Sequence, residues 1–523
     1  MKQPGAHLET ETGTEIGSGS ANAARFLWRS AERAPERVAM RDGDRAVSYG
    51  ELRSRAGAFA ASMGDQGVRR GDRVVVFLER GVDAAAAYLG TWALGAIAVM
   101  VHETARARQI EYVLGHSGAR GLIASEEALN RLHRPLETSV ELLRVEGLPR
   151  GEEFEPVNTD PEEPAQITYT SGSTGLPKGV LASHANVIAA IETVSGYLGL
   201  SVDDRIASVL PFSSVYGANQ LLCALHVGAE LIVERSPVAN GIAAGLRECG
   251  ATVLAGVPAL WTQLLAAPGF RERPIESLRI LQNAGGHLPP ATGRQLREAQ
   301  PQAAVVLQYG MTEVFRSTYL PPEEFDRRPG SMGKAMPGTE ILVVREDLTE
   351  CAIDEVGELV HAGPTVTMGY WNDPDRTGAV YRPHPLGRGN APVVFSGDMV
   401  RRDAEGYLHY VGRRDRMIKS LGFRVGPDEV LDVLHASGEI VDGVVTSVPD
   451  DRRGEAIVAV VVMAPGGSLA RLKQFVRLEL PRHMHPARID VQDALPRMPN
   501  GKHDVLAVQR ALLAPQAPLP TAR

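Results

Sequence analysis

Short apolar runs rich in β-branched residues alternate with helical stretches from about residue 25 to about residue 414. This alternation predicts α/β layers in which helices cover mostly parallel sheets. The chain has 523 residues, which is too long for one hydrophobic core, so we expect two or more domains. The strand-like runs are 74–78, 121–124, 205–210, 230–233, 252–255 and 304–308, and examples of the helical stretches are 185–198 and 259–266.

The pattern changes after residue 414. Gly-Pro-Asp-Glu at 426–429 begins a helix, because proline suits the first helical position and acids suit the first turn. A strand-like run at 456–463, a helix at 472–480 and a tail punctuated by proline and glycine follow. We therefore predict a large N-terminal α/β domain at residues 22–414 and a small α+β C-terminal lid at residues 415–523.

Composition and charge exclude several classes of protein. The net charge of −8 provides no general basic field for nucleic acid, and we expect no nucleic-acid partner. Residues 1–21 lack an apolar segment and are expected to form a flexible tail, not a signal peptide. Residues 84–101 are too weakly apolar for a membrane span, so we expect a buried helix followed by a strand, and no membrane partner. Three dispersed cysteines favour the reducing cytoplasm.

A glycine- and hydroxyl-rich loop with one lysine follows the strand-like start at residue 167. The segment 167–179 reads I-T-Y-T-S-G-S-T-G-L-P-K-G. Its backbone N–H groups and hydroxyls can surround phosphate oxygens, but its spacing is not that of a Walker A loop. Only six of the 55 basic residues are lysines, so a lysine kept in such a loop is expected to be needed for its compact ammonium. Lys178 and Lys502 both meet this description.

This loop resembles the phosphate loop of the adenylate-forming superfamily, which includes acyl-CoA synthetases, adenylation domains of peptide synthetases and firefly-type luciferases. Further motifs of that family recur in its order over roughly residues 25 to 510. They are Tyr-Gly-Met-Thr-Glu at 309–313, Ser-Gly-Asp at 396–398, Gly-Arg-Arg-Asp at 412–415 with Lys-Ser-Leu-Gly-Phe-Arg at 419–424, and Pro-Asn-Gly-Lys at 499–502. One such motif alone is weak, but the set in this order is specific.

The resemblance implies that ATP and Mg²⁺ activate a carboxylic acid. A carboxylate that attacks the α-phosphorus of ATP brings anion toward anion, so cations are needed where charge accumulates. In the family pattern Lys502 reaches the substrate carboxylate and the α-phosphate, Glu313 binds Mg²⁺ and Thr312 holds the α-phosphate. The nucleotide-binding residues implied are Thr170, Ser171, Gly172, Ser173, Thr174, Gly175, Lys178, Gly285, Gly286, Tyr309 (on adenine), Gly310, Asp398 and Arg413 (both on ribose).

The resemblance also implies a second half-reaction with coenzyme A. Family members rotate the C-terminal lid between the adenylation state and the thiol-transfer state, and Asp415 matches the hinge position. The segment from Lys419 to Arg424 would then face the active site, with Arg424 among the catalytic residues. Gly422 would give the pantetheine arm close passage along the backbone.

The expected acyl pocket is mostly apolar. It comprises Ser213, Ser214, Val215, Tyr216, Gly217, Val257, Pro258 and Ala284, so we expect a hydrophobic aliphatic, alicyclic or aryl acid. Serine stands at position 214, where relatives frequently have a gating histidine. No aspartate lies between residues 210 and 222, which argues against an α-amino acid. No cation in these segments clearly demands a second carboxylate.

Four functions are compatible with the motifs. The first is an ATP-dependent acyl-CoA synthetase, and the second is an acyl-AMP ligase that loads a carrier-protein phosphopantetheine. The long insertion typical of fatty acyl-AMP ligases is not evident before the hinge, which favours coenzyme A. A luciferase-like oxygenase and a homologue that performs only one half-reaction complete the set, although retention of Lys178, Glu313, Asp398 and Lys502 argues against the last.

Overall fold

The protein contains three β-sheets. The computed structural model describes residues 21–132, 134–148, 153–170, 177–420, 423–450, 454–480, 482–498 and 501–513. The first sheet has a parallel half, in which the strand order is β1-β10-β9-β11-β12-β13. The bounds are β1 Val38–Asp42, β9 Arg205–Ser208, β10 Glu230–Val233, β11 Val253–Gly256, β12 Ile280–Asn283 and β13 Ala304–Tyr309. Because parallel strands end at the same edge, the loops after β11, β12 and β13 lie together.

The same sheet continues past β13 as antiparallel strands. Their order is β14-β15-β21-β20-β17-β16, with bounds β14 Thr318–Leu320, β15 Ser331–Ala335, β16 Glu340–Val344, β17 Val356–Ala362, β20 Val393–Arg402 and β21 Leu408–Arg413. Neighbouring strands in this part are antiparallel, whether a short turn joins them, as between β20 and β21, or a long segment does, as residues 363–392 between β17 and β20. The prediction of mostly parallel sheets up to residue 414 is therefore wrong for this segment.

The second sheet has the order β18-β8-β7-β4-β3-β5-β6. Its parallel strands are β3 Arg73–Phe77, β4 Ile97–Met100, β5 Gly121–Ala124, β6 Glu141–Arg144 and β7 Pro164–Thr170, and β8 Lys178–Ser183 and β18 Gly369–Tyr370 are antiparallel. The apolar segment 84–101 forms helix α3 (Val82–Ala93) and β4, as predicted. Among the described residues no helix is both long and apolar enough to cross a bilayer.

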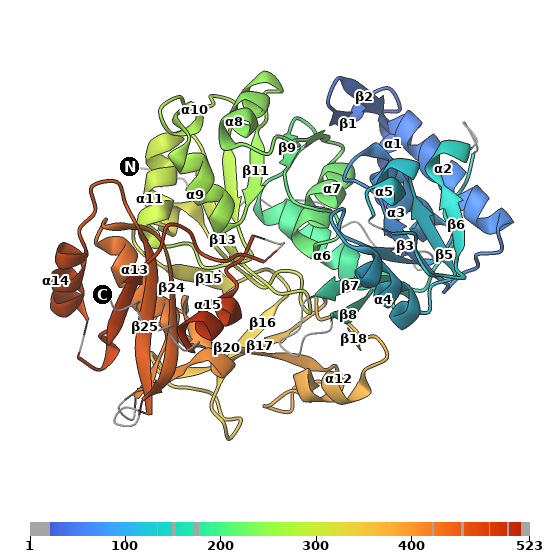
Figure 1. The fold of residues 1–523 in the computed structure, drawn as a ribbon. Helices are drawn as coiled ribbons and strands as arrows, with labels where there is room; N and C mark the ends of the chain where they lie inside the picture. Colours follow the sequence, from blue (N-terminus) through green and yellow to red (C-terminus); the bar gives the residue numbers. More distant parts are fainter. Residues whose placement is uncertain are drawn as a thin grey trace, which may run out of the picture.

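Helices pack between and around the two large sheets (Figure 1). Helices α2 (Tyr49–Asp65), α3, α6 (His184–Tyr197) and α7 (Val215–Val227) contribute to the largest core cluster. A Cβ atom on Gly90 would lie 2.5 Å from the carbonyl oxygen of Ala56, so glycine lets α2 and α3 approach closely. On the other face of the first sheet, α8 (Ala239–Glu248), α9 (Pro258–Ala266) and α11 (Pro290–Ala299) cover a second core.

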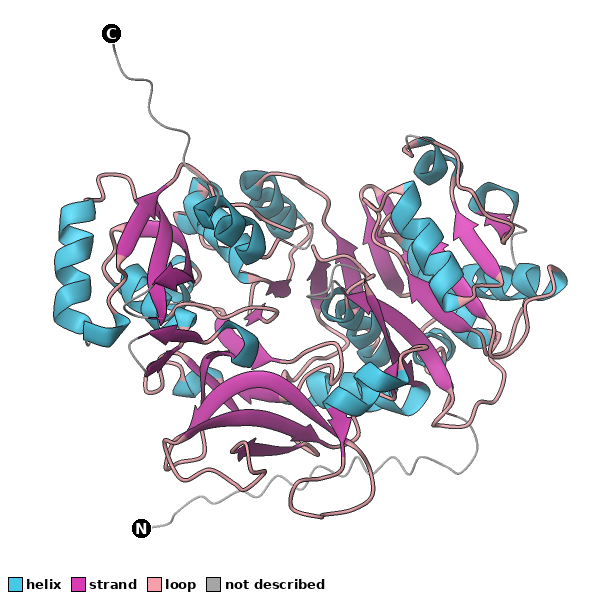
Figure 2. Cartoon of the chain, turned by 60° about the horizontal axis from the view of Figure 1, so that its bottom comes forward, coloured by secondary structure: helices cyan, strands magenta, loops and turns pink. Residues whose placement is uncertain are grey.

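The C-terminal residues form a separate α+β layer beside the first sheet (Figures 1 and 2). Its sheet has the order β23-β22-β25-β24, with β26 paired to β25. The strands are β22 Ile418–Ser420, β23 Phe423–Val425, β24 Ile440–Asp450, β25 Gly454–Met463 and β26 Arg488–Val491, and the helices are α13 Pro427–Ala436, α14 Leu469–Glu479 and α15 Val505–Leu513. This matches the predicted fold class of a large α/β domain with a small α+β lid.

The predicted loop-like tail after residue 480 contains more structure than expected. Residues 488–491 extend the lid sheet as β26, and α15 packs on the opposite face of the sheet from α13 and α14. Val508 of α15 lies in one apolar cluster with Val444 and Val460. Both faces of the lid sheet are therefore covered by helices.

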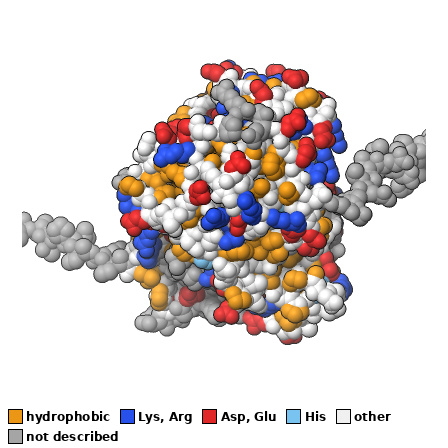
Figure 3. All heavy atoms as spheres, turned by 90° about the vertical axis from the view of Figure 1, so that its right-hand side faces the viewer, with side chains coloured by type: hydrophobic (Ala, Val, Ile, Leu, Met, Phe, Trp, Pro, Cys, Tyr) orange, Lys and Arg blue, Asp and Glu red, His pale blue; other side chains and the backbone are white. Residues whose placement is uncertain are grey.

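The molecular face over the second sheet carries mixed charge (Figure 3). Arginines there pair with acids, as in Arg134 with Glu111 and Arg144 with Glu126. All three cysteines are free thiols.

Candidate active site

The phosphate-loop hairpin joins β7 to β8, where Thr170 pairs in register with Lys178. The predicted loop residues Ser171, Gly172, Ser173, Thr174 and Gly175 lie outside the described residues. Thr170 ends β7 and its buried hydroxyl has no partner among the described residues. The strand pairing therefore fixes both ends of the loop and presents Lys178 at its exit.

Lys178 contacts the predicted metal ligand directly. Its Nζ donates to Oε1 of Glu313 at 2.8 Å and to the hydroxyl of Tyr370 at 2.8 Å. Tyr370 donates to the same carboxylate oxygen at 2.6 Å. Glu313 is buried, so the ammonium compensates a carboxylate that is costly to desolvate. Burial, together with Glu313, raises the pKa of Tyr370 and keeps this phenol neutral.

Tyr309, Asp398 and Arg413 form the second cluster. Asp398 on β20 faces Arg413 on β21 in register, and Arg413 donates to its Oδ1 at 3.1 Å. Tyr309, at the end of β13, donates its hydroxyl to the other carboxylate oxygen of Asp398. Burial raises the pKa of Asp398, although Arg413 and Tyr309 favour its charged form. The predicted adenine platform and ribose acceptor are thus joined by one hydrogen bond.

The conformation around Tyr309 depends on a glycine. A Cβ atom on Gly310 would lie 2.1 Å from the carbonyl oxygen of Phe315, so no other residue fits without displacement of the backbone. Thr312 lies in the turn that follows, partly buried, beside Glu313. The ring of His361 stacks on Tyr309 with the centroids 5.8 Å apart. Burial lowers the pKa of His361 to about 3, so this ring is neutral at physiological pH.

Lys502 sits on a tight turn of the lid. The N–H of Met498 donates to the carbonyl of Lys502 at 2.7 Å, and Gly501 has φ of +80°. Asp442 of β24 pairs with Arg497 and His503 on the two sides of this turn. A Cβ atom on Gly501 would lie 3.8 Å from Cβ of Ala259 in α9. Met498, Gly501 and Lys502 are therefore joined by backbone hydrogen bonds, and Gly501 lies near α9 of the large domain.

The ammonium of Lys502 lies within the electrostatic reach of the second cluster. The residue stays open to solvent, but the protein packed round the ammonium lowers the pKa of Lys502. Arg416 and Arg413 add to this lowering, and Asp398 opposes it. The charges of Asp398, Arg413 and Arg416 thus act on the ammonium of Lys502, and its role at the reacting phosphate stays a prediction.

Three of the eight predicted acyl-pocket residues, Tyr216, Val257 and Ala284, meet in one apolar cluster. The ring of Tyr216 clusters with Ala255 and Ala284, its hydroxyl donates to the carbonyl of Gln282 at 2.9 Å, and Val257 borders the group. Gly285, with φ of +79°, packs near Val257, and a Cβ atom on Gly286 would lie 3.1 Å from the Pro258 ring. A Cβ atom on Gly217 would lie 2.1 Å from the carbonyl oxygen of Pro211.

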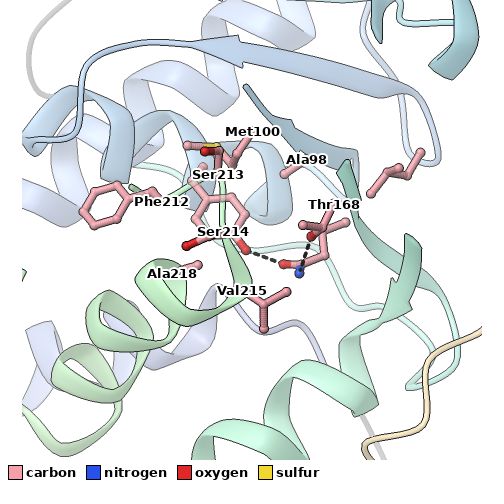
Figure 4. A pocket seen from close by; sticks show the side chains of 11 residues that line it. Ala98, Met100, Thr168, Phe212, Ser213, Ser214, Val215 and Ala218 are labelled. Atoms are coloured by element: carbon pink, nitrogen blue, oxygen red, sulfur yellow. Dashed lines mark hydrogen bonds between the residues drawn. The ribbon is translucent and has the colours of Figure 1, made fainter. Parts of the chain in front are cut away.

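Ser213, Ser214 and Val215 line a different cavity, between the start of α7 and strands β4 and β7 (Figure 4). Met100 and Thr168 border it from the second sheet. Ser214 caps α7, because its Oγ accepts from the N–H of Gly217 at 3.0 Å and donates to the carbonyl of Pro211 at 2.9 Å. Ser214, at the position where relatives frequently have a gating histidine, is thus hydrogen-bonded to the backbone of both Pro211 and Gly217.

The structure describes part of the predicted hinge segment. Asp415 lies in the 3₁₀ turn Arg414–Arg416, and Arg414 pairs with Glu358 of β17 at 2.7 Å. Lys419 and Arg424 are opposite each other in the β22–β23 pair. Gly422 lies outside the described residues.

A contact between the domains was missed in the sequence. Nε2 of His287, after β12, lies 2.8 Å from Oδ1 of Asp432 on α13. Burial lowers the pKa of His287, but the charge and hydrogen bond of Asp432, with Asp428, outweigh burial and raise it. Burial also raises the pKa of Asp428. Nothing in the spacing of residues 287 and 432 signals this pair, because it joins two domains.

We expect His287→Gln to lower the melting temperature by about 2 °C near pH 6 and by less near pH 9. The folded-state pKa is raised, so the ion pair stabilises fully below the unfolded pKa and is lost as pH rises through the folded one. Differential scanning calorimetry of the variant, of Asp432→Asn and of the double variant measures the effect. An equal loss at both pH values, or additive losses, would contradict the ion pair.

Known protein families match both the N-terminal and the C-terminal part of the chain. The AMP-binding enzyme family matches residues 27–371, and the AMP-binding enzyme C-terminal domain matches residues 429–502. The chain is 30% identical to the 2-succinylbenzoate–CoA ligase of Geobacillus kaustophilus, over 88% of this chain and 92% of that protein. It is also 30% identical to the probable non-canonical nonribosomal peptide synthetase CymA of Salinispora arenicola, covering 96% of this chain but 6% of that much longer protein.

The fold agrees as well. The ATP-bound structure of MatB from Rhodopseudomonas palustris superposes with a TM-score of 0.85 at 26% identity, covering 94% of this chain and 99% of that one. The two family matches, the shared fold and the ordered motifs lead to one conclusion. The chain belongs to the AMP-binding enzymes of the adenylate-forming superfamily.

Proposed function

We propose that this chain is an ATP-dependent acid–thiol ligase, which converts a carboxylic acid with a largely apolar body to its acyl-adenylate and then to a coenzyme A thioester. The observation that carries the proposal is that the fold joins residues of separate motifs by hydrogen bonds, Lys178 to Glu313 and Tyr309 to Asp398. Lys502 on the lid would then meet both the sugar-phosphate side and the acid side of the site.

In the first step, an oxygen of the substrate carboxylate attacks the α-phosphorus of ATP and pyrophosphate leaves. Asp398 accepts hydrogen bonds from the ribose hydroxyls, and Tyr309 orients Asp398 while its ring packs on adenine. Lys502 holds the carboxylate and the α-phosphate together and neutralises the charge that grows between them. Lys178 and Thr312 bind the phosphate oxygens.

The donor set fits Mg²⁺. This ion is commonly held by one or two carboxylates together with substrate phosphates, and it supplies charge neutralisation of those phosphates. Among the described residues no group of three or more His, Cys, Asp or Glu side chains could hold a metal, so Glu313 would be the main protein ligand. Lys178 and Tyr370 both donate to Oε1 of Glu313, so Oε2 is the oxygen that would hold the metal.

We expect Glu313→Gln to lower adenylate formation by about 10- to 100-fold, because a hydrogen bond or ligand oxygen at a charged group contributes about 1.5–3 kcal/mol. Initial rates of pyrophosphate release across a Mg²⁺ titration measure this loss, and the apparent Mg²⁺ requirement should rise. Glu323→Gln makes the same chemical change on the exposed turn Pro322–Glu324 and serves as the control. Normal rates with normal Mg²⁺ dependence would show that Glu313 is not the ligand.

In the second step, the thiol sulfur attacks the acyl carbon and AMP leaves. We propose that the lid rotates about Asp415 between the steps and that Lys419, Gly422 and Arg424 then line the thiol path. The carrier-protein alternative rests on the similarity to a peptide synthetase, and the coenzyme A alternative on the similarity to a CoA ligase.

A panel of carboxylic acids tests the proposal. Pyrophosphate release is measured with each acid and ATP alone, and thioester formation is measured with coenzyme A and, separately, with a phosphopantetheinylated carrier protein. Thioester formed on coenzyme A supports the proposal. Thioester formed only on the carrier protein would identify the carrier protein, not coenzyme A, as the acceptor. Absence of pyrophosphate release with every acid would overturn it.

A further inference from the structure

Arg316 is a buried cation beside the acyl pocket. Only 4% of the residue is exposed, and its guanidinium carbon lies 4.2 Å from the centroid of the Tyr216 ring. Its Nε donates to Oε1 of Gln308 at 3.3 Å, and one terminal nitrogen donates to the carbonyl of Phe315 at 3.0 Å. Among the described residues no carboxylate forms an ion pair with it. A buried charge without a counter-ion is costly, so its retention requires a cause.

Residues that share a helix or a hydrogen bond with Tyr216 or Arg316 have buried polar atoms without partners among the described residues. Asn219 lies three residues after Tyr216 on α7, so the two share one helix face. Asn219 is 1% exposed, and neither its amide nitrogen nor its oxygen has a partner among the described residues. Oε1 of Gln282 and Nε2 of Gln308 are likewise buried and unpartnered there. Buried polar atoms of this kind normally have a partner, which points to a polar ligand group.

The positive charge of Arg316 acts on the pKa values of residues along α7 and beside it. Burial raises the pKa of Cys223 to about 11, and Arg316 acts to lower it. Arg316 acts in the same direction on Tyr216 and Tyr197, whose pKa values burial raises. Tyr216, Asn219 and Cys223 follow one another at helical spacing, so the guanidinium faces the row they form.

The backbone before Arg316 is strained. Phe315 has φ of +55°, in the left-handed region that non-glycine residues rarely adopt. Such conformations cost about 1–3 kcal/mol and persist where the surrounding structure requires them. Here the strained residue turns the chain between Glu313 and β14, and its carbonyl accepts from Arg316 itself. The strain therefore helps to direct the guanidinium toward Tyr216.

We propose that Arg316 is a specificity-determining residue and that the acid carries a second anionic group, a carboxylate or sulfonate, at the end remote from the reacting carboxylate. This inference rests on the proposed function and refines its substrate class. The remote anion supplies the counter-charge that Arg316 lacks, and the amides of Asn219 and Gln308 donate to it. The apolar surface of Val257 and Ala284 contacts the body of the acid.

A matched substrate series tests the inference. Adenylate formation is measured for α,ω-dicarboxylic acids of increasing length, each compared with its own monomethyl ester, and for the corresponding ω-sulfonates. For the length that fits, the wild type should prefer the dianion by about 10²-fold in kcat/KM, because an unpaired buried charge is left with the ester. In Arg316→Gln this preference should fall to within a few-fold of one, with the ester activated as in the wild type.

Two further variants separate the interpretations. Arg316→Lys keeps the charge but loses the planar fork, and should retain part of the preference. Arg297→Gln makes the same change on α11, where the arginine is half-buried, lies over the Phe325 ring and pairs with Asp326, and should leave the preference unchanged. If the wild type activates esters as well as dianions, Arg316 is structural and the inference is wrong while the proposed function stands. If no acid is adenylated, both fail.

Discussion

Lys502→Ala should reduce adenylate formation by about 10²–10³-fold, the effect typical of removing one preorganised electrostatic donor. The N–H of Met498 donates to the carbonyl of Lys502, and Asp442 pairs with residues on both flanks, which fixes the backbone that carries the lysine. A lysine on a fixed backbone needs little reorganisation to reach the reacting phosphate, so its removal should have a large effect. Pyrophosphate release with acid and ATP measures the loss.

The same variant should still form thioester from a supplied acyl-adenylate, since we propose a role for the lysine in the first step alone. Lys473→Ala removes the exposed lysine of α14 and controls for a general loss of lid charge. Wild-type pyrophosphate release in Lys502→Ala would falsify the assignment. Equal loss in both half-reactions would indicate a damaged lid instead.

Asp415→Pro should abolish most thioester formation while adenylation falls only modestly. Asp415 lies in a 3₁₀ turn, whose φ of about −60° is the value that proline fixes. The lid position seen here is therefore compatible with proline, whereas rotation to another position needs torsions that proline forbids. Proline also disfavours the helical conformation of Arg414, which accounts for the modest loss in adenylation.

The two half-reactions are measured separately for this variant. Pyrophosphate release with the acid and ATP reports the first, and thioester formed from a pre-made adenylate reports the second. Asp415→Ala keeps both backbone torsions free and is the matched control. Undiminished thioester formation in Asp415→Pro would show that the lid pivots elsewhere.

The fold was largely predictable because periodicity records burial. The strands at residues 121–124 and 230–233 were predicted with the bounds that the structure has, since continuous apolar runs mark strands covered on both faces. Strand direction was not predictable for residues 318–413. Apolar patterns in β17 and β20 look alike in either direction, and the segment 363–392 that joins these strands is long enough for either pairing.

The candidate site was likewise predictable only in part. Tyr309, Glu313, Asp398 and Lys502 were predicted because each belongs to a short motif, and the structure brings Lys178 to Glu313 and Tyr309 to Asp398. Whether each performs its predicted role stays a prediction.

Arg316 and Tyr370 belong to no motif we used. Arg316 stands three residues after Glu313 in an apolar segment, and a cation in such a segment is a signal that sequence reasoning can use. Tyr370 gave no such signal in the sequence, because its hydrogen-bond partner Glu313 is 57 residues away. Contacts between distant segments are set by tertiary packing.

The contact between Gly501 and Ala259 links the lid to the acyl pocket. Ala259 is the second residue of α9, and Pro258 before it packs against Gly286 at the pocket wall. We therefore expect an acid too bulky for the predicted pocket to displace the start of α9 and, with it, the turn that carries Lys502. Redesign of the pocket for larger acids consequently has to reshape this helix start and the lysine turn together.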